Sequence, residues 1–413
     1  MKKSNNNILA LCLLVIIEAI LFRISSIYDN NILQTIVIVI NTIITIILLL
    51  RGKRENERKA NSIIAISLLI RTALLFFDIY TGKGLFTGKD TEAFYECALG
   101  ISNGYETNSY SILLNLVANI IGPNRLVLQY INVLSSLVSM LYFKKILSNV
   151  SNNRISTIAF ALFSLSPLSM LLSSSLLRES IMIMLNVLSI NFFIKWFKNG
   201  NKQNFLLSLI MAIASTWLHS GMILVIFAYM ISFILYEPKI KKISFRKNTI
   251  FALILVMLLS ILIIAVFNNS LTKYFSKFDS LDSVGTVKEV ANADYLPFLN
   301  NAPFYILAIF LPLKMLYFLF SPMIWDIRTA SMIIAIIFSS SLYIYLTISL
   351  FKYKKIKNIL ASLIILAAIL VIIPYAIGTH NSGAATRHRE KILPFLVVAY
   401  AVKEREYRKN ESN

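Results

Sequence analysis

Charged residues are scarce in this chain. Asp, Glu, Lys and Arg make up only 15% of its 413 residues, whereas a soluble domain averages roughly 25%. Hydrophobic residues make up 57%, and many stand in continuous runs close to the ~20 residues that cross a bilayer as a helix. The runs do not alternate, which excludes a membrane barrel. Since backbone polar groups in lipid must pair within their own segment, we predict an all-α polytopic membrane protein.

Cysteine and histidine are also rare, with two and three copies. Cys12 lies in an apolar run and Cys97 in a connecting segment, so the sequence offers neither a disulfide framework nor a metal-ligand spacing. No Walker motif, glycine-rich phosphate loop or nucleophile elbow is present. We therefore expect no cofactor and no metal, and any reaction should draw its driving force from the substrate.

Acids number half as many as bases, which leaves a formal charge of +20. Most of the Lys and Arg residues fall in five connections and the two tails. These connections are 51–59, 144–154, 195–202, 239–247 and 352–357. Basic loops of this kind mark the cytoplasmic side of a membrane rather than a nucleic-acid surface. We expect a multi-pass protein of the cytoplasmic (inner) membrane with both termini in the cytoplasm.

The apolar runs predict about twelve transmembrane helices within one membrane domain, residues 1–413. The expected spans are 8–27, 31–50, 61–80, 126–143, 155–172, 178–194, 204–218, 221–236, 249–267, 330–351, 358–377 and 391–403. The stretches 111–121 and 304–320 are short, and keeping every basic loop on one side makes them interfacial or re-entrant helices. External loops then cover 81–125, 268–329 and 378–390.

The first external loop carries two acids, Asp90 and Glu92, just after Gly88. A helix is expected to begin there, so both acids could cap its first N–H groups. Alternatively, a carboxylate at the membrane surface could take a proton from a hydroxyl group. Asp90 is our candidate catalytic base, and Glu92 and Arg125 are secondary candidates.

Arg178 follows a serine-rich segment, 173–175, at the predicted outer end of a span. A charge beside lipid needs a partner. That partner could be the neighbouring Glu179, a secondary candidate itself. It could also be an anionic ligand such as a lipid diphosphate, because a planar guanidinium binds two phosphate oxygens at once.

All three histidines fall on the predicted external side. His219 ends a span and could be a hydrogen-bonded interior group, a proton carrier or a donor to phosphate. The last external loop gathers His380, Arg387, His388 and Arg389, where positive charge is otherwise avoided. These residues could contact lipid headgroups or bind a polyanionic substrate.

Two patterns resemble known families. Leu177-Arg178-Glu179 stands about 40 residues before Trp217-Leu218-His219-Ser220-Gly221, which resembles the Wzy-type and EpsG-like polysaccharide polymerases of bacterial envelopes. Asp90…Tyr95…Gly104, together with Arg387-His388-Arg389…Pro394, is similar to membrane glycosyltransferases of the GT-C type.

The resemblance implies a GT-C-like fold and a polymerase that joins undecaprenyl-diphosphate-linked repeat units on the outer membrane face, for capsule, O-antigen or exopolysaccharide. Asp90 or His219 would act as base, and Arg178, Arg387 and Arg389, with His380 and His388, would hold the diphosphate. Membrane lipid, a flippase and a chain-length regulator would be partners. A lipid-linked oligosaccharide flippase, an O-antigen ligase, another GT-C enzyme and a glycan acyltransferase stay open as alternatives.

Overall fold

The computed structural model describes residues 17–26, 31–51, 55–82, 89–101, 109–244, 294–299, 302, 304–328 and 330–411. Its contacts divide the chain into two compact units. The first contains residues 1–141 and 169–184, and the second contains 142–168 and 185–413. This division groups contacts and does not test whether the chain forms one membrane domain. The single domain expected from the sequence therefore stays a prediction.

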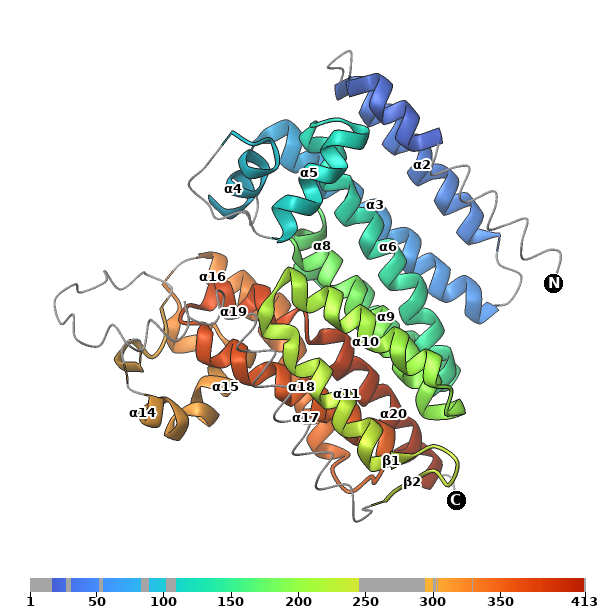
Figure 1. The fold of residues 1–413 in the computed structure, drawn as a ribbon, viewed down its shortest axis with the longest axis vertical. Helices are drawn as coiled ribbons and strands as arrows, with labels where there is room; N and C mark the ends of the chain where they lie inside the picture. The colour runs from blue at the N-terminus through green and yellow to red at the C-terminus, as the bar shows by residue number, and fades with distance from the viewer. Residues whose placement is uncertain are drawn as a thin grey trace. The chain divides into compact units, whose positions relative to one another are not determined.

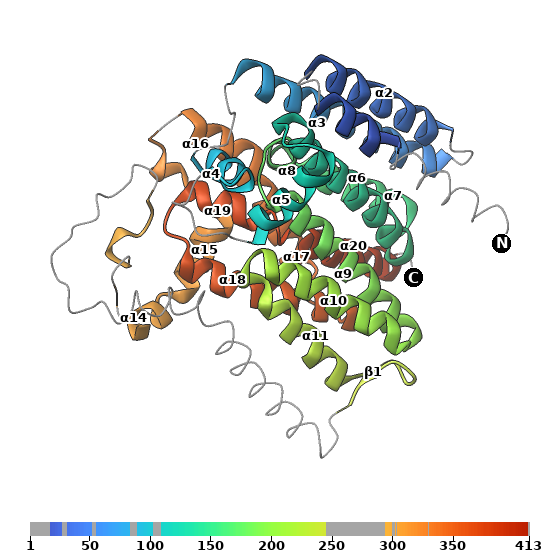
Figure 2. The same cartoon turned by 45° about the horizontal axis from the view of Figure 1, so that its top comes forward.

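The first unit is built from helices that pack in pairs. Helix α2 (Asn31–Leu50) lies along α3 (Glu55–Thr81), and the short helix α4 (Lys89–Ala98) packs on α5 (Ser109–Ile121), as Figure 2 shows. The core joins α2, α3 and the first part of α6 (Arg125–Val150), with Ile38, Leu75 and Val133 fully buried. The unit also contains the end of α8 (Pro167–Ser173) and the start of α9 (Glu179–Asn199).

The second unit is organised around α18 (Ile359–Gly378), which packs against α11 (Ile223–Leu235), α15 (Leu311–Phe320) and α20 (Leu393–Glu411) (Figure 1). Helix α18 has a mean hydropathy of 2.8 over its most apolar stretch, so it can be surrounded by protein and lipid without polar partners. Helix α20 also contacts α7 (Asn153–Ser164) and α17 (Ser341–Lys352). The remaining helices of the unit are α10 (Lys202–Leu218), α14 (Phe304–Ile309), α16 (Ala330–Ala335) and α19 (Ser382–Arg389).

Short elements connect these helices. The 3₁₀ turns are η1 (Ser220–Met222), η3 (Pro297–Leu299) and η4 (Ile324–Asp326), and η5 (Ile336–Ser340) is a π-helical turn between α16 and α17. Strands β1 (Tyr236–Glu237) and β2 (Lys242–Ile243) form a two-stranded antiparallel hairpin.

Six helices in the described part of the chain are long and apolar enough to cross a membrane, or seven if the bent pair α7 and α8 is one span. The all-α multi-pass architecture agrees with the prediction, and the two stretches expected to be short form α5 and α14–α15. The predicted spans 204–218 and 221–236 are the shorter helices α10 and α11. The span 249–267 and half of 8–27 lie outside the described residues, so a count of about twelve stays a prediction.

Three helices of the second unit run between the same two ends. Lys202 begins α10 and His219 follows its last residue, which at 1.5 Å per residue puts them about 25 Å apart. Helix α18 is capped by Asn358 and carries Tyr375 in its last turn, and α20 begins just after Lys391. One end of the unit therefore gathers basic connections, and the other gathers the residues singled out in the sequence.

Candidate functional site

In the first unit, the predicted acidic helix lies against Arg178. The Arg178 guanidinium stands 6.0 Å from the centre of the Phe94 ring, and Phe94 belongs to α4. Asp90 precedes Phe94 by four residues on the same helix, so both side chains share a face. The unit therefore brings together a helix with the candidate base and a cation with the geometry to bind phosphate.

Buried amides of α6 fix the loop that carries Arg178. The Asn132 Nδ2 group donates to the carbonyls of Ser175 (2.6 Å) and Leu177 (2.9 Å), and it also contacts the Tyr110 hydroxyl at 3.1 Å. Gln129 donates to the Ser174 carbonyl at 3.2 Å. Each donor occupies a backbone acceptor that would otherwise be buried without a partner. These hydrogen bonds therefore fix the backbone turn that precedes Arg178, immediately before α9.

The secondary candidates Glu92 and Arg125 form an ion pair, with 2.7 Å between Nη1 and Oε1. Arg125 also lies over the Tyr95 ring at 5.8 Å, and the Tyr95 hydroxyl donates to the Pro123 carbonyl at 2.9 Å. Because Glu92 is 56% exposed, this pair contributes little to stability. Its effect is to join α4 to the start of α6.

Glu179 is the first residue of α9, and its side chain is buried close to Tyr110. An acid in the first turn of a helix is stabilised by the partial positive charge of that end. Burial is the main cause that raises the pKa of Tyr110, and Glu179 raises it further.

Arg71 of α3 is buried and faces protein. Its guanidinium donates to the Ser169 carbonyl at 2.7 Å and to the Ser67 hydroxyl at 3.1 Å, and it also bonds Ser173. This buried arginine holds the serine-rich segment that leads to Arg178.

In the second unit, His219 occupies the junction between α10 and η1. Its Nδ1 atom accepts a hydrogen bond from the Gly221 backbone N–H at 3.2 Å and lies 3.2 Å from the Tyr375 hydroxyl. Because a backbone N–H can only donate, Nδ1 is an acceptor, and neutral His219 must carry its proton on Nε2. The ring is therefore a donor through Nε2, which favours a hydrogen bond to phosphate over proton abstraction by Nε2.

His388 shows the same arrangement. Lys391 Nζ stands 2.8 Å from His388 Nδ1, and an ammonium group can only donate, so neutral His388 also carries its proton on Nε2. Lys391 is fully buried and lies 5.1 Å from the centre of the Tyr375 ring. The two histidine rings meet edge to face with 5.2 Å between their centroids. We call His219, Tyr375, His388 and Lys391 the donor group.

Gly221, two residues after His219, occupies a position that has no room for a side chain. A Cβ atom at that position would stand 3.0 Å from the Tyr375 ring and 3.2 Å from His219 Nδ1. Both contacts are tighter than side chains usually tolerate. The glycine lets the backbone approach closely enough for its N–H to orient the His219 ring.

Helix α19, which carries Arg387 and His388, is anchored at both ends. At its start, Asn381 accepts from the Ala384 N–H at 2.8 Å as an N-cap. The preceding residue, His380, accepts at its carbonyl from the Tyr295 N–H at 3.0 Å. His380 thus lies at the start of α19, whereas Arg387 and His388 occupy its last turn.

Arg389 is held inside this unit by hydrogen bonds to its own chain, and the expectation that it binds a diphosphate stays a prediction. It is fully buried and donates to four acceptors: Leu319 O (2.8 Å), Ser321 O (2.6 Å), and the hydroxyls of Ser339 (2.6 and 3.1 Å) and Ser340 (3.2 Å). Its guanidinium also stacks over the Tyr343 ring at 4.9 Å. Burial lowers the pKa of Arg389 to about 10, so the group stays charged at neutral pH.

The neighbouring Glu390 balances this buried charge. Its carboxylate accepts from the Ser166 hydroxyl at 3.1 Å and from the Tyr343 hydroxyl at 3.3 Å. Three consecutive side chains therefore have different surroundings: Arg389 and Glu390 face the protein interior, and His388 belongs to the donor group. Arg387, half-buried, precedes them in the last turn of α19.

Sequence reasoning missed Tyr375 and the role of Lys391. Tyr375 is one of two hydroxyl-bearing residues in an otherwise apolar helix, and only the adjacent Pro374 hints at a local irregularity. Lys391 stands in a basic run, and nothing in that run shows that its ammonium turns inward. Asn132, which shapes the Arg178 turn, is likewise a polar side chain in a mostly apolar span, as is Gln129.

Residues 109–267 match the family model described as dolichyl-phosphate-mannose-protein mannosyltransferase. The matched segment contains Arg178 and His219, and Asp90 and Arg387 lie outside it. No curated protein and no solved structure matches the chain. The family match supports a membrane glycosyltransferase of the GT-C class. Together with the apolar helices, it indicates a multi-pass membrane enzyme.

Proposed function

We propose that the protein transfers saccharides from a polyprenyl diphosphate carrier, as a polymerase of undecaprenyl-diphosphate-linked repeat units on the outer face of the cytoplasmic membrane. The observation that carries this proposal is the donor group. Its two imidazoles present Nε2–H groups, and Lys391 adds a buried positive charge. Hydrogen-bond donors and cations suit a diphosphate, which carries several acceptor oxygens.

In this proposal the reaction is a displacement at the anomeric carbon. A general base, for which the sequence offers Asp90 or His219, takes the proton of the acceptor hydroxyl, and the resulting oxygen forms the new bond to the sugar. The bond between the sugar and the carrier phosphate breaks, and its electron pair leaves with the diphosphate. His219, His388 and Arg387 donate hydrogen bonds to those oxygens, and the sequence prediction gives Arg178 the same role. Arg389 and Glu390 keep α19 in position and contact no substrate.

The test uses a strain that lacks this protein, complemented with single variants. Arg178→Ala and Arg387→Ala should abolish long-chain surface glycan while the protein still reaches the membrane. Arg58→Ala, an exposed arginine of a predicted cytoplasmic connection, is the matched control and should restore normal chains. Surface glycan capped with single repeat units supports a polymerase, whereas units trapped in the cytoplasm indicate a flippase. Normal chains from both site variants would contradict the proposal.

A second candidate is favoured by the family match. The matched model describes an enzyme whose name gives a lipid monophosphate sugar as donor, so this chain could transfer one sugar from such a carrier. Purified protein offered a diphosphate-linked oligosaccharide and a monophosphate-linked sugar separates the two. Consumption of the monophosphate donor alone would favour the second candidate.

A further inference from the structure

Two adjoining cavities lie at the end of the second unit that is opposite to the donor group. The first has a volume of about 400 Å³, and the second about 350 Å³. They share Lys198 and Tyr236 as a common wall. We call them the basic hollows because, among the residues that the structure describes, six cationic side chains and two carboxylates line them. The cations are Lys198, Lys202, Lys239, Lys241, Lys357 and Arg405.

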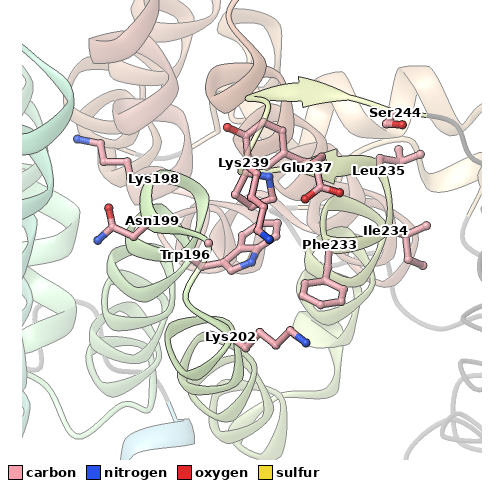
Figure 3. A pocket seen from close by; sticks show the side chains of 13 residues that line it. Trp196, Lys198, Asn199, Lys202, Phe233, Ile234, Leu235, Glu237, Lys239 and Ser244 are labelled. Atoms are coloured by element: carbon pink, nitrogen blue, oxygen red, sulfur yellow. The ribbon is translucent and has the colours of Figure 1, made fainter.

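The first hollow has an aromatic wall. The Trp196 ring is buried and packs against Phe233, with 5.7 Å between centroids, and against Tyr236 at 6.0 Å. Figure 3 shows the Lys202 side chain extending toward Phe233, and Lys239 on the hairpin side of the same hollow. Aromatic rings beside lysine ammonium groups are typical of the boundary between lipid and water.

Two cations of the second hollow are held in place by the end of α6. Lys198 Nζ donates to the Asn149 carbonyl at 2.6 Å, and Arg405 donates to the Val150 carbonyl at 3.3 Å. These carbonyls belong to the last turn of α6, where cations are favoured. Their positive ends are therefore fixed before any ligand arrives, which reduces the entropy that binding costs.

The remaining cations of the second hollow, Lys241 and Lys357, come from two separate connections. Lys241 lies between β1 and β2 with a φ of +52°, a left-handed conformation that side chains other than glycine rarely adopt. This position supplies a lysine to the second hollow.

We propose that the basic hollows bind the headgroup of an anionic phospholipid. Charge complementarity favours a phosphate, because the cations outnumber the carboxylates Glu237 and Glu406 by four. Their place favours a lipid over a soluble anion, since they open at the ends of apolar helices α9, α11 and α18. Basic pockets at the cytoplasmic ends of membrane helices bind such headgroups. This site is separate from the one in the proposed function and does not depend on it.

The test measures lipid-dependent thermal stability of the purified full chain. Phosphatidylglycerol should raise the apparent Tm by several degrees, and phosphatidylcholine with the same acyl chains should not. The double variant Lys241→Gln/Lys357→Gln should lose more than half of that shift. The control Lys354→Gln/Lys355→Gln removes the same amount of charge from the connection that contains Lys357, but from residues outside both hollows, and it should keep the full shift.

Three results would overturn the proposal. The first is an equal response of the test and control variants to phosphatidylglycerol, and the second is an equal response of the wild type to phosphatidylcholine. The third is a full shift produced by millimolar inorganic phosphate, which would show a soluble-anion site. If the first double variant does not fold, Lys202→Gln/Lys239→Gln in the other hollow makes the same comparison, with the same expected loss.

Discussion

Replacing Arg389 by lysine should destabilise the second unit without directly removing a substrate contact. Arginine uses its N–H groups on four acceptors inside the protein, and lysine has three donors at a single atom. At least one buried acceptor is left without its partner, at a cost of about 1–3 kcal/mol. Losing the stacking on Tyr343 adds about 1 kcal/mol. We therefore expect a loss of about 2–4 kcal/mol in the free energy of unfolding.

The assay is thermal unfolding of purified protein in detergent. At about 2–4 °C per kcal/mol for a unit of this size, the apparent Tm of Arg389→Lys should fall by roughly 5–15 °C. Arg387→Lys is the matched control, since it keeps the charge on a half-buried side chain of the same helix. It should reduce glycan synthesis and leave the Tm within about 1–2 °C of wild type. An unchanged Tm for Arg389→Lys, combined with loss of product, would refute the structural role and restore Arg389 as a ligand-binding residue.

Three further predictions concern the second unit. His219→Gln keeps an N–H donor and should retain more product than His219→Ala, which should lose about 10–100-fold, the effect of one hydrogen bond to a charged group. Equal losses on a glycan gel would favour a base role. Gly221→Ala should lower activity by displacing Tyr375 or His219, at unchanged membrane abundance, and full activity would show that the contact relaxes freely. Burial lowers the pKa of Lys314 to about 8, below the ~10.4 of the unfolded chain. Because the folded state then releases this proton first, wild-type stability should rise between pH 8 and 10, and the rise should be smaller in Lys314→Met.

The sequence predicted the helical membrane architecture well because hydropathy and charge act locally along the chain. Long apolar runs such as 31–50 and 358–377 appear as α2 and α18 with nearly the same bounds. Runs 204–218 and 221–236 were harder to classify, since α10 and the η1–α11 pair are shorter than a full span. Their place in the membrane depends on neighbouring helices, which periodicity does not record.

The candidate site was predictable only in part. Basic residues on the side opposite to the other basic loops drew attention to 387–389, but charge alone could not separate them. Arg389 turns inward because Ser339, Ser340 and two carbonyls surround it, and these groups come from residues about 50 to 70 positions away in the sequence. Tyr375 escaped notice for the same reason: its contact with His219 joins residues 156 positions apart.

The length of α18 has a consequence for the membrane in which the protein works. Twenty residues at 1.5 Å each span about 30 Å, which equals the hydrocarbon thickness of a typical bilayer. Its first residues help to line a basic hollow, and its last turn carries Tyr375. In a thicker bilayer α18 would be shorter than the hydrocarbon layer. The helix would then tilt less, and Tyr375 in its last turn would lie deeper in the lipid. Acyl-chain length thus becomes a variable that sets how far the histidine rings stand from the water.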